Sequence, residues 1–351
     1  MPTWVGDVVM ATPALRALRV RFPNTHLSLL IRPNTRDVVR GLPGVGEVMT
    51  WRGNGQVREA WSTARALRRG RFDSALLLSN SFRSAATVWL AGIPRRVGYA
   101  RDGRSWLLTD RVAPLRAGRR FAVVSTVHYY NALVRRLGGC DPGESMELAT
   151  SPEDDAAVQG RLEGWGIAEA SPLVVINPGA SFGVSKLWIP ERYGEVADRL
   201  IAERGAAVVI TFGPGERPLA QRVRDAMRHP AFLVDDPPGT LSQLKSLIRR
   251  CDLLLNNDTG PRHFAKAFNR RVVTVFGSTD PAWTHTDYPL ERVVRIDLDC
   301  SPCHQKVCPL GHHRCMTDLT SDMVHAAAVE LLDGYSTGLP LSVQTESPDQ
   351  P

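Results

Sequence analysis

Residues 252–268 read DLLLNNDTGPRHFAKAF, an apolar run that is followed by a polar loop and a helical pattern. The run at 252–255 predicts a buried strand, and the pattern that continues to Phe268 predicts a helix. In α/β proteins, ligands bind just beyond the carboxyl end of such a strand. A Gly-containing turn there exposes backbone N–H groups at a helix N-terminus, which suits a phosphate. We therefore expect an anion site here, with Asp258 and His263 on either side of it.

The rest of the second half repeats this alternation of strands and helices. Alternating strands and helices imply right-handed βαβ units and a parallel sheet that is covered on both faces. The first half alternates less regularly, and its Gly- and Arg-rich segment 95–120 predicts a long functional loop. The strands that we expect are 27–31 and 74–78 in the first half, and 173–176, 207–212, 232–234, 252–255 and 272–276 in the second.

A chain of 351 residues suggests two domains. We expect an α/β protein with two Rossmann-like domains, residues 1–165 and 166–333, whose parallel sheets face each other across a cleft. Residues 334–351 are rich in Ser, Pro and Gln, which predicts a disordered tail. A buried strand normally precedes a loop such as residues 4–7, yet only three residues stand before it. Either the start is truncated or the first domain lacks its expected central strand, and we favour a misplaced start.

The composition is that of a basic globular protein, with 43% hydrophobic residues, 23% charged residues and a formal net charge of +7. No apolar run approaches the ~20 residues that span a bilayer, and no secretory signal is visible, which favours the cytoplasm. The positive charge is either a solvated surface or an attraction to an anionic substrate, including one held in a membrane leaflet. No nucleic-acid-binding module is recognisable, so nucleic acid is not an expected partner.

Several expected strands of the second half end in Gly-bearing polar loops. One loop carries Gly179 and ends at Lys186, where a lysine can reach a diphosphate. A second carries Glu216, an acid placed to hydrogen-bond ribose hydroxyls, and a third comprises residues 258–260. Taken singly, each has a plainer interpretation as an ordinary βα loop, a turn or a helix cap. Because parallel strands end at one edge of their sheet, the loops together predict a composite site for a sugar-nucleotide diphosphate.

An acidic residue also lies near the start of the chain. Gly6 and Asp7 precede an expected helix at 12–21, and they are predicted to lie in a loop. From spacing alone, Asp7 is best interpreted as an N-terminal cap of that helix. A carboxylate that faces a cleft can instead act as the general base that removes a proton from an acceptor hydroxyl.

Four of the six cysteines are clustered in one short segment, as Cys300, Cys303, Cys308 and Cys315. In a cytosolic protein such clustering indicates a metal more than disulfides. The spacing matches no standard zinc signature, and the neighbouring histidines are alternative ligands. The cluster therefore predicts either a structural zinc or iron site, or a redox-sensitive or simply buried group of thiols.

The motifs fall in the order of a known family. They are residues 2–7 (PTWVGD), 80–85 (NSFRSA), 91–94 (AGIP), 177–180 (NPGA) and 257–260 (NDTG). On these motifs, over nearly the whole chain, the sequence resembles the bacterial lipopolysaccharide heptosyltransferases of glycosyltransferase family 9, most closely the heptosyltransferase II branch. The resemblance implies a GT-B fold and an inverting glycosyl transfer that requires no cofactor.

The resemblance also implies roles for individual residues. Asp7 matches the catalytic base, and Lys186 matches the residue that stabilises the leaving diphosphate. The first domain would bind the lipopolysaccharide core acceptor, at the cytoplasmic face of the inner membrane, and the second would bind ADP-heptose. The residues implied are Asn80, Ser81 and Arg83 for the acceptor, and Gly179, Lys186, Glu216, Asp258, Thr259, Gly260 and His263 for the donor.

The sequence departs from the family in three places. The apolar first strand is absent, the Cys cluster occurs in only some relatives, and Arg262 stands where the family usually has an apolar residue.

Two other functions fit the pattern, namely a GT-B enzyme with another donor or a protein acceptor, and a non-catalytic sugar-nucleotide-binding protein. A basic zinc-ribbon-like nucleic-acid binder is a third class, which the strand-end loops do not support. The oligomeric state stays open.

Overall fold

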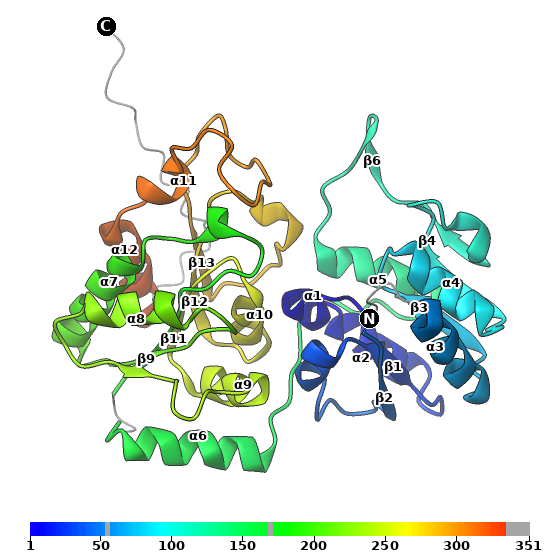
Figure 1. The fold of residues 1–351 in the computed structure, drawn as a ribbon, viewed down its shortest axis with the longest axis horizontal. Helices are drawn as coiled ribbons and strands as arrows, with labels where there is room; N and C mark the ends of the chain where they lie inside the picture. Colours follow the sequence, from blue (N-terminus) through cyan, green and yellow to red (C-terminus); the bar gives the residue numbers. More distant parts are fainter. Residues whose placement is uncertain (53–56, 168–170, 335–351) are drawn as a thin grey trace, which may run out of the picture. The chain divides into compact units, whose positions relative to one another are not determined.

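The computed structural model describes residues 1–52, 57–167 and 171–334, and the chain divides into two compact units (Figure 1). The first unit is residues 1–149 together with 282–286, and the second is the remainder. Apart from Gly334, the expected disordered tail lies outside the described residues. In the part of the chain that the structure describes, no helix is long and apolar enough to cross a membrane.

The second unit contains the parallel sheet that the alternating pattern predicts. Its strand order is β10-β9-β8-β11-β12-β13, which is the order of a Rossmann fold with β8 as its first strand. Every neighbouring pair is parallel. The strands are β8 Leu173–Asn177, β9 Ala207–Ile210, β10 Phe232–Leu233, β11 Leu253–Asn257, β12 Arg271–Val275 and β13 Glu291–Val294.

Helices cover both faces of this sheet because alternate strand residues point to opposite sides. Val174 and Ile176 of β8 belong to a core that also contains residues of α7, α8 and α12. On the other face α9 contacts β8, and α9 also packs against α6 and α10. The helices are α6 Pro152–Gly164, α7 Pro190–Arg204, α8 Arg217–Asp225, α9 Leu241–Arg250, α10 Gly260–Ala267 and α12 Ser321–Leu332.

The first unit has a divided sheet. Strands β1 and β2 form one parallel pair, and β3, β4 and β5 form a separate parallel sheet. Helices α1 Val5–Met10, α2 Thr12–Arg21, α3 Val57–Arg69, α4 Phe82–Leu90 and α5 Thr126–Leu137 pack around them. The strands are β1 Ser28–Ile31, β2 Glu47–Thr50, β3 Ser74–Leu77, β4 Arg95–Tyr99 and β5 Asp110–Val112, and the short antiparallel strands β6 Arg116–Ala117 and β7 Arg120–Phe121 follow.

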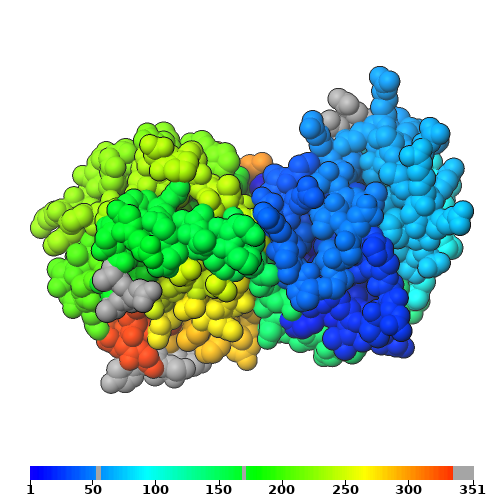
Figure 2. Space-filling view, turned by 90° about the horizontal axis from the view of Figure 1, so that it is seen from below, coloured from blue at the N-terminus to red at the C-terminus, as the bar shows by residue number. Residues whose placement is uncertain are grey.

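The structure corrects three local predictions. The segment 95–120 is not a long loop, because β4 and β5 within it extend the sheet from β3. Asp7 does not precede a helix but lies in the first turn of one, α1, whose N-cap is Trp4. Helix α6 lies ahead of the expected domain boundary at 165, yet it packs against α9 and belongs to the second unit, as the adjoining green and yellow surfaces of Figure 2 show.

Candidate active site

The carboxyl ends of β8 and β11 are joined by one buried side chain, Asn257. Its Nδ2 donates to the carbonyl of Pro178 at 2.7 Å. Its Oδ1 accepts from the backbone N–H of Trp188 at 3.2 Å and from the hydroxyl of Tyr193 at 3.0 Å. The side chain therefore holds the loop after β8 at both ends, which fixes the position of Lys186 between them.

Lys186 and Asp258 form an ion pair at this edge of the sheet. The Nζ of Lys186 contacts the Asp258 carboxylate and also donates to the Asp258 carbonyl at 3.2 Å. The two side chains are only 11% and 10% exposed. Thr279 donates to the same carboxylate at 2.9 Å. The structure thus brings together two predicted donor-site residues that lie far apart in the sequence.

Behind Asp258 lies a buried network of charges. Arg262 is 3.6 Å from the Asp258 carboxylate and pairs with Glu291, which also accepts from Lys266 at 3.0 Å. Burial raises the pKa of Asp258, but the charges of Lys186 and Arg262 outweigh that effect and hold the pKa below its ordinary value. Asp258 is therefore an anion at neutral pH.

Replacing Glu291 by Gln is expected to lower the free energy of unfolding at pH 7 by about 3 kcal/mol, because two buried cations lose their carboxylate. Burial raises the pKa of Glu291, but the charges of Arg262 and Lys266 lower it by more than burial raises it. The pKa therefore lies below its ordinary value of 4.5 in the folded state. A carboxyl group whose pKa is lowered by folding stabilises the folded state at pH values above its pKa in the unfolded state. This stabilisation is lost as the pH falls through its pKa in the folded state.

Urea unfolding of both proteins at pH 7 and below pH 4.5 measures this effect. The difference between wild type and Glu291→Gln should shrink on acidification. Glu195 is exposed on α7, and Glu195→Gln should change stability by at most about 0.5 kcal/mol. Equal losses in the two variants would show that the buried network does not stabilise the fold.

The N-terminus of α10 carries polar atoms without protein partners. Thr259 is the N-cap, yet its side chain makes no capping bond, and its buried Oγ1 has no hydrogen-bond partner among the described residues. The Nδ1 of His263 is likewise buried, and no atom in the described part of the chain forms a hydrogen bond with it. Burial lowers the pKa of His263 to about 3, and the charges of Arg262 and Lys266 add to this effect. His263 is therefore neutral at physiological pH, and with Gly260 it lies at the helix end that favours anions.

Gly179 and Glu216 also meet. A Cβ atom on Gly179 would lie 2.0 Å from the Glu216 carboxylate, so a larger residue at this position would displace the Glu216 side chain. One oxygen of Glu216 accepts from the backbone N–H of Gly213 at 2.8 Å. The loops after β8 and β9 therefore place this carboxylate at the strand ends.

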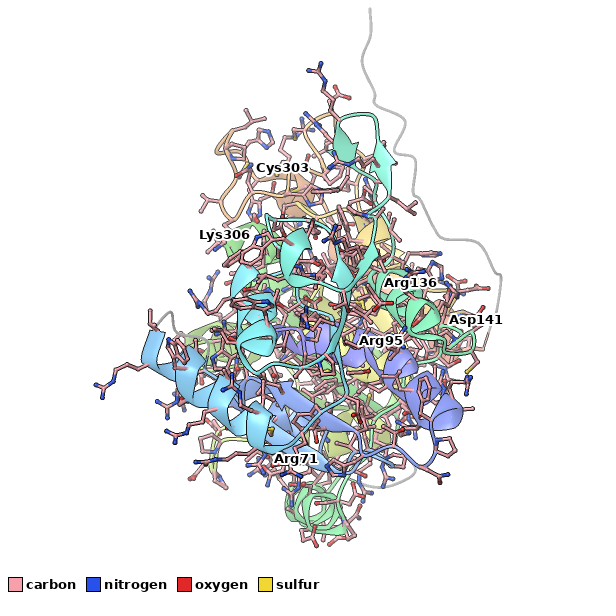
Figure 3. All side chains as sticks on the ribbon, turned by 90° about the vertical axis from the view of Figure 1, so that its right-hand side faces the viewer. Arg71, Arg95, Arg136, Asp141, Cys303 and Lys306 are labelled. Atoms are coloured by element: carbon pink, nitrogen blue, oxygen red, sulfur yellow. The ribbon has the colours of Figure 1, made fainter. Side chains whose placement is uncertain are left out.

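The cysteine segment packs against the loop that carries Lys186. The Nε2 of His313 lies 3.0 Å from the Ser185 carbonyl, and the Ser185 N–H donates to the Lys306 carbonyl at 3.1 Å. Cys303 and Lys306 lie in this segment (Figure 3). The four predicted cysteines line one small cavity of about 20 Å³ with His312 and His313. Among the described residues no three potential ligands converge closely enough to hold a metal ion.

In the first unit, Asp7 lies close to α5. The negative charge of Asp7 adds to burial in raising the pKa of Tyr130 well above its ordinary value. Asp7 is partly exposed, while the following residues Val8 and Val9 are fully buried. Helix α1 thus buries its apolar side, while Asp7 in its first turn stays partly exposed.

Asn80 is held by two residues that the sequence did not point to. Its Oδ1 accepts from Arg104 at 3.1 Å and from the Tyr129 hydroxyl at 3.1 Å. Arg104 is fully buried and also donates to the carbonyls of Ser79 and Tyr99. The other predicted acceptor residues, Ser81 and Arg83, are exposed at the start of α4.

Each unit thus contains its own set of predicted site residues. Lys186 with Asp258, and Gly179 with Glu216, are brought together by the second unit, and Asn80 is fixed by the first. Arg104, Tyr129 and Glu291 were missed. A buried arginine in a Gly- and Arg-rich segment carries no distinguishing sequence signal, because its burial depends on strands that the sequence did not predict.

Two α/β units with parallel sheets, the second with the strand order of a Rossmann fold, agree with the GT-B class of glycosyltransferase folds. The chain belongs to glycosyltransferase family 9 (heptosyltransferase), whose sequence profile matches residues 60–314. It is 27% identical over 336 residues to lipopolysaccharide heptosyltransferase 2 of Escherichia coli K12, with 92% of this chain and 94% of that protein covered.

Solved structures agree with this assignment. The structure of E. coli ADP-heptose lps heptosyltransferase II matches with a TM-score of 0.77 and 25% identity, and covers 94% of this chain and 96% of that one. A glycosyltransferase of family 9 from Veillonella parvula matches with a TM-score of 0.81, at 21% identity and with 95% of each chain covered. The latter shows the fold alone. The protein is a glycosyltransferase.

Proposed function

We propose that this protein transfers a heptose from ADP-heptose to the inner core of lipopolysaccharide, with inversion at the anomeric carbon. The observation that carries the proposal is the Lys186–Asp258 pair beside the open N-terminus of α10, in a member of a heptosyltransferase family. The relatives named lipopolysaccharide heptosyltransferase 2 support both the donor and the acceptor.

The second unit would hold the donor. Transfer from a sugar diphosphate builds negative charge on the leaving ADP, and fixed donors aimed at that charge stabilise the transition state. Lys186, the unpartnered hydroxyl of Thr259 and the backbone N–H groups at the start of α10 are such donors. Glu216 would accept from the ribose hydroxyls. Since these groups supply positive charge and hydrogen bonds themselves, we propose that the transfer requires no cofactor.

The first unit would hold the acceptor. Inversion requires that the acceptor hydroxyl attack the sugar from the face opposite the leaving diphosphate. Asp7 would remove the proton of that hydroxyl as general base. Asn80, whose Oδ1 is already fixed by Arg104 and Tyr129, would orient the acceptor together with Ser81 and Arg83.

A donor screen tests the proposed function. Purified protein is incubated with a heptose-deficient lipopolysaccharide core and with ADP-heptose, ADP-glucose or UDP-glucose in turn, and the released nucleotide is measured. We expect ADP release from ADP-heptose only, and only with acceptor present. Release with another donor, or with a protein acceptor instead, would indicate the alternative GT-B activity. Tight donor binding without release would indicate a non-catalytic binding protein.

We further propose a structural zinc or iron ion at Cys300, Cys303, Cys308 and Cys315, whose thiols would have to move closer together than they lie in this structure to bind it. The thiols surround one cavity, and the negative charges of the other three would raise the pKa of Cys315 beyond the effect of its burial. The backbone N–H of His313 lies 3.4 Å from the Cys308 sulfur and lowers the pKa of that thiol. Elemental analysis of the purified protein measures the metal content, and less than about 0.1 ion per chain would exclude the site.

We also propose that the protein works at the cytoplasmic face of the inner membrane. Three exposed aromatic rings cluster on the first unit. The ring centroid of Trp106 lies 5.9 Å from that of Trp89 and 6.2 Å from that of Phe82. Aromatic side chains favour the headgroup region of a bilayer, and the net charge of +7 favours anionic lipids. Sedimentation with vesicles that contain anionic lipid tests this, and Trp106→Ser should weaken the association. Equal sedimentation of the two proteins would exclude the cluster as the contact.

A further inference from the structure

Lys186 and Thr279 contact the Asp258 carboxylate from two different loops of the second unit. Lys186 lies in the loop after β8, and Thr279 lies in the loop after β12. The residues directly before them, Ser185 and Ser278, are both 1% exposed. Their hydroxyl oxygens lie 2.9 Å apart. One contact between two hydroxyls therefore joins the two loops, one residue away from each partner of Asp258.

The direction of this hydrogen bond follows from the other partner of Ser185. Ser185 donates its hydroxyl proton to the carbonyl of Gln305 at 2.5 Å. A carbonyl oxygen can only accept, and a serine hydroxyl has one proton to donate. The hydroxyl of Ser278 therefore donates to that of Ser185, and a chain of hydrogen bonds runs from Ser278 through Ser185 to Gln305.

The cysteine segment also holds both loops through its backbone. The Ser185 N–H donates to the Lys306 carbonyl at 3.1 Å, and the His304 N–H donates to the Ser278 carbonyl at 2.7 Å. The segment comes close to the first loop at Gly183, where a Cβ atom would lie 2.5 Å from the Lys306 carbonyl oxygen. Because that oxygen belongs to the backbone, a larger residue at 183 would push the loop and the segment apart.

Lys186 depends on this support because its own helix is very short. It is the last residue of the 3-10 helix η3 Val184–Lys186, which has three residues. A single helical turn is marginal without tertiary contacts. In the middle of this turn, the N–H, the hydroxyl and the carbonyl of Ser185 are each hydrogen-bonded to the cysteine segment. The segment therefore sets the direction in which the Lys186 side chain leaves the turn.

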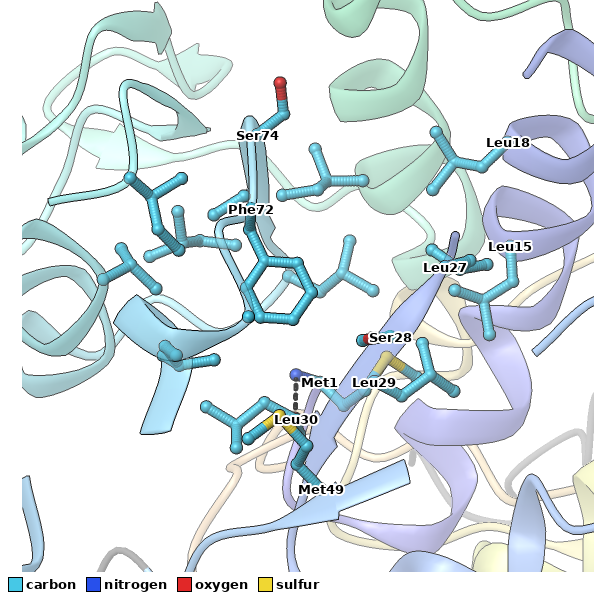
Figure 4. Close-up of a pocket in the computed structure, with 18 of the residues that line it drawn as sticks. Met1, Leu15, Leu18, Leu27, Ser28, Leu29, Leu30, Met49, Phe72 and Ser74 are labelled. Carbon is cyan, nitrogen blue, oxygen red and sulfur yellow. Dashed lines mark hydrogen bonds between the residues drawn. The ribbon is translucent and has the colours of Figure 1, made fainter. Parts of the chain in front are cut away.

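Little water can compete for these hydroxyls. The cavity that Ser185 and Ser278 line with the four cysteines has a volume of about 20 Å³, which is room for about one water molecule. The cavity beside β1 and β3 of the first unit is far larger, at about 680 Å³ (Figure 4). Removing one hydroxyl from the small cavity would leave its buried partner with little water to replace it, which costs more than the hydrogen bond itself contributes.

We propose that Ser185 is a positioning residue for Lys186, and that with Ser278 it couples the cysteine segment to the diphosphate-binding site. This role rests on the proposed function, in which Lys186 binds the diphosphate of the donor. Ser185 acts through Lys186 and not by contact with the donor. The hydroxyl pair holds the loops of Lys186 and Thr279 together, so that the ammonium group meets the diphosphate in one geometry.

A double-mutant cycle tests this role, with ADP as the ligand and its Kd as the measured quantity, so transfer activity is not required. Ser185→Ala removes two hydrogen bonds and is expected to raise the Kd for ADP about 10-fold. In the Lys186→Ala protein the same substitution should raise the Kd by less than about 2-fold, because no lysine is left to position. Ser278→Ala keeps the hydrogen bond from Ser185 to Gln305, and it should have a smaller effect in the same direction.

Ser246→Ala is the matched control. Ser246 is fully buried in α9 of the same unit, and its hydroxyl has no hydrogen-bond partner among the described residues. Its replacement also removes a hydroxyl from the protein interior, and it should leave the Kd for ADP within about 2-fold of the wild-type value. Tm is measured for every variant, which separates a loss of positioning from a loss of folding.

An unchanged Kd in both serine variants, beside a raised Kd in Lys186→Ala, would overturn the positioning role alone. An equal rise in Kd on adding Ser185→Ala to the wild type and to Lys186→Ala would also overturn it, because Ser185 would then act without the lysine. An unchanged Kd in Lys186→Ala would contradict the diphosphate site of the proposed function, and this role with it. If Ser185→Ala does not fold, the cycle with Ser278→Ala decides between the same outcomes.

Discussion

Replacing Asp7 by Asn is expected to lower kcat for heptose transfer by at least about 100-fold, because a general base contributes roughly that much or more. The Kd for ADP-heptose should not change, since Lys186 and Asp258, the residues that we propose bind the donor, belong to the second unit. Asn has the size of Asp but cannot accept the proton of the attacking hydroxyl. Single-turnover transfer and calorimetric titration with ADP-heptose measure the two quantities separately.

Asp73→Asn is the matched control for this prediction. Asp73 is an exposed carboxylate of the same unit, directly before β3, and its replacement should leave both kcat and Kd near their wild-type values. If Asp7→Asn transfers heptose at the normal rate, another group removes the proton. If its Tm falls as well, the loss reflects the packing of α1 and not the chemistry.

Replacing Lys186 by Ala is expected to weaken binding of ADP-heptose and to slow transfer by about 100- to 1,000-fold, the effect of removing one donor from a developing anion. The side chain has two roles in the structure. It pairs with the largely buried Asp258, and it lies where the diphosphate would bind. Without it, Asp258 keeps its contacts with Arg262 and Thr279, so we expect the protein to remain folded.

Lys306→Ala is the control here, because Lys306 is an exposed lysine that neighbours the same loop through its backbone. It should bind the donor and transfer heptose normally. Lys186→Arg should restore part of the affinity, since the charge remains, but less of the rate, because the guanidinium has a different geometry. Normal kinetics in Lys186→Ala would mean that the phosphates bind elsewhere.

The fold was predicted best where burial is complete. Strands β8 and β11 are apolar runs between polar loops, and such runs leave little doubt about burial. Strands β4 and β13 were missed because charged residues begin them. Arg95 of β4 pairs with Asp110 of β5, and Glu291 of β13 belongs to the buried network with Arg262. A charge that is neutralised by a partner distant in sequence cannot be distinguished, in the sequence, from a charge in solvent.

The sequence predicted individual residues of the candidate site but not the contacts between them. Gly-bearing loops at strand ends identified Gly179, Lys186 and Asp258 because parallel strands end at one edge. That Lys186 pairs with Asp258 depends on the loop after β8, whose course is set by Asn257. The support of Asn80 by Arg104 depends in the same way on tertiary contacts between separate segments.

The first unit is formed by two separate segments of the chain, so this enzyme cannot be divided into its two units by a single cut. Residues 282–286 belong to the first unit although the chain on both sides of them belongs to the second. At the start of α5, Ser125 donates to the His285 carbonyl at 2.5 Å and Thr126 donates to that of Trp283 at 2.9 Å. A cut near residue 150 would therefore place these hydroxyls and their acceptors on different fragments. Reassembly of co-expressed halves would then be bimolecular, so fragment complementation should depend on protein concentration.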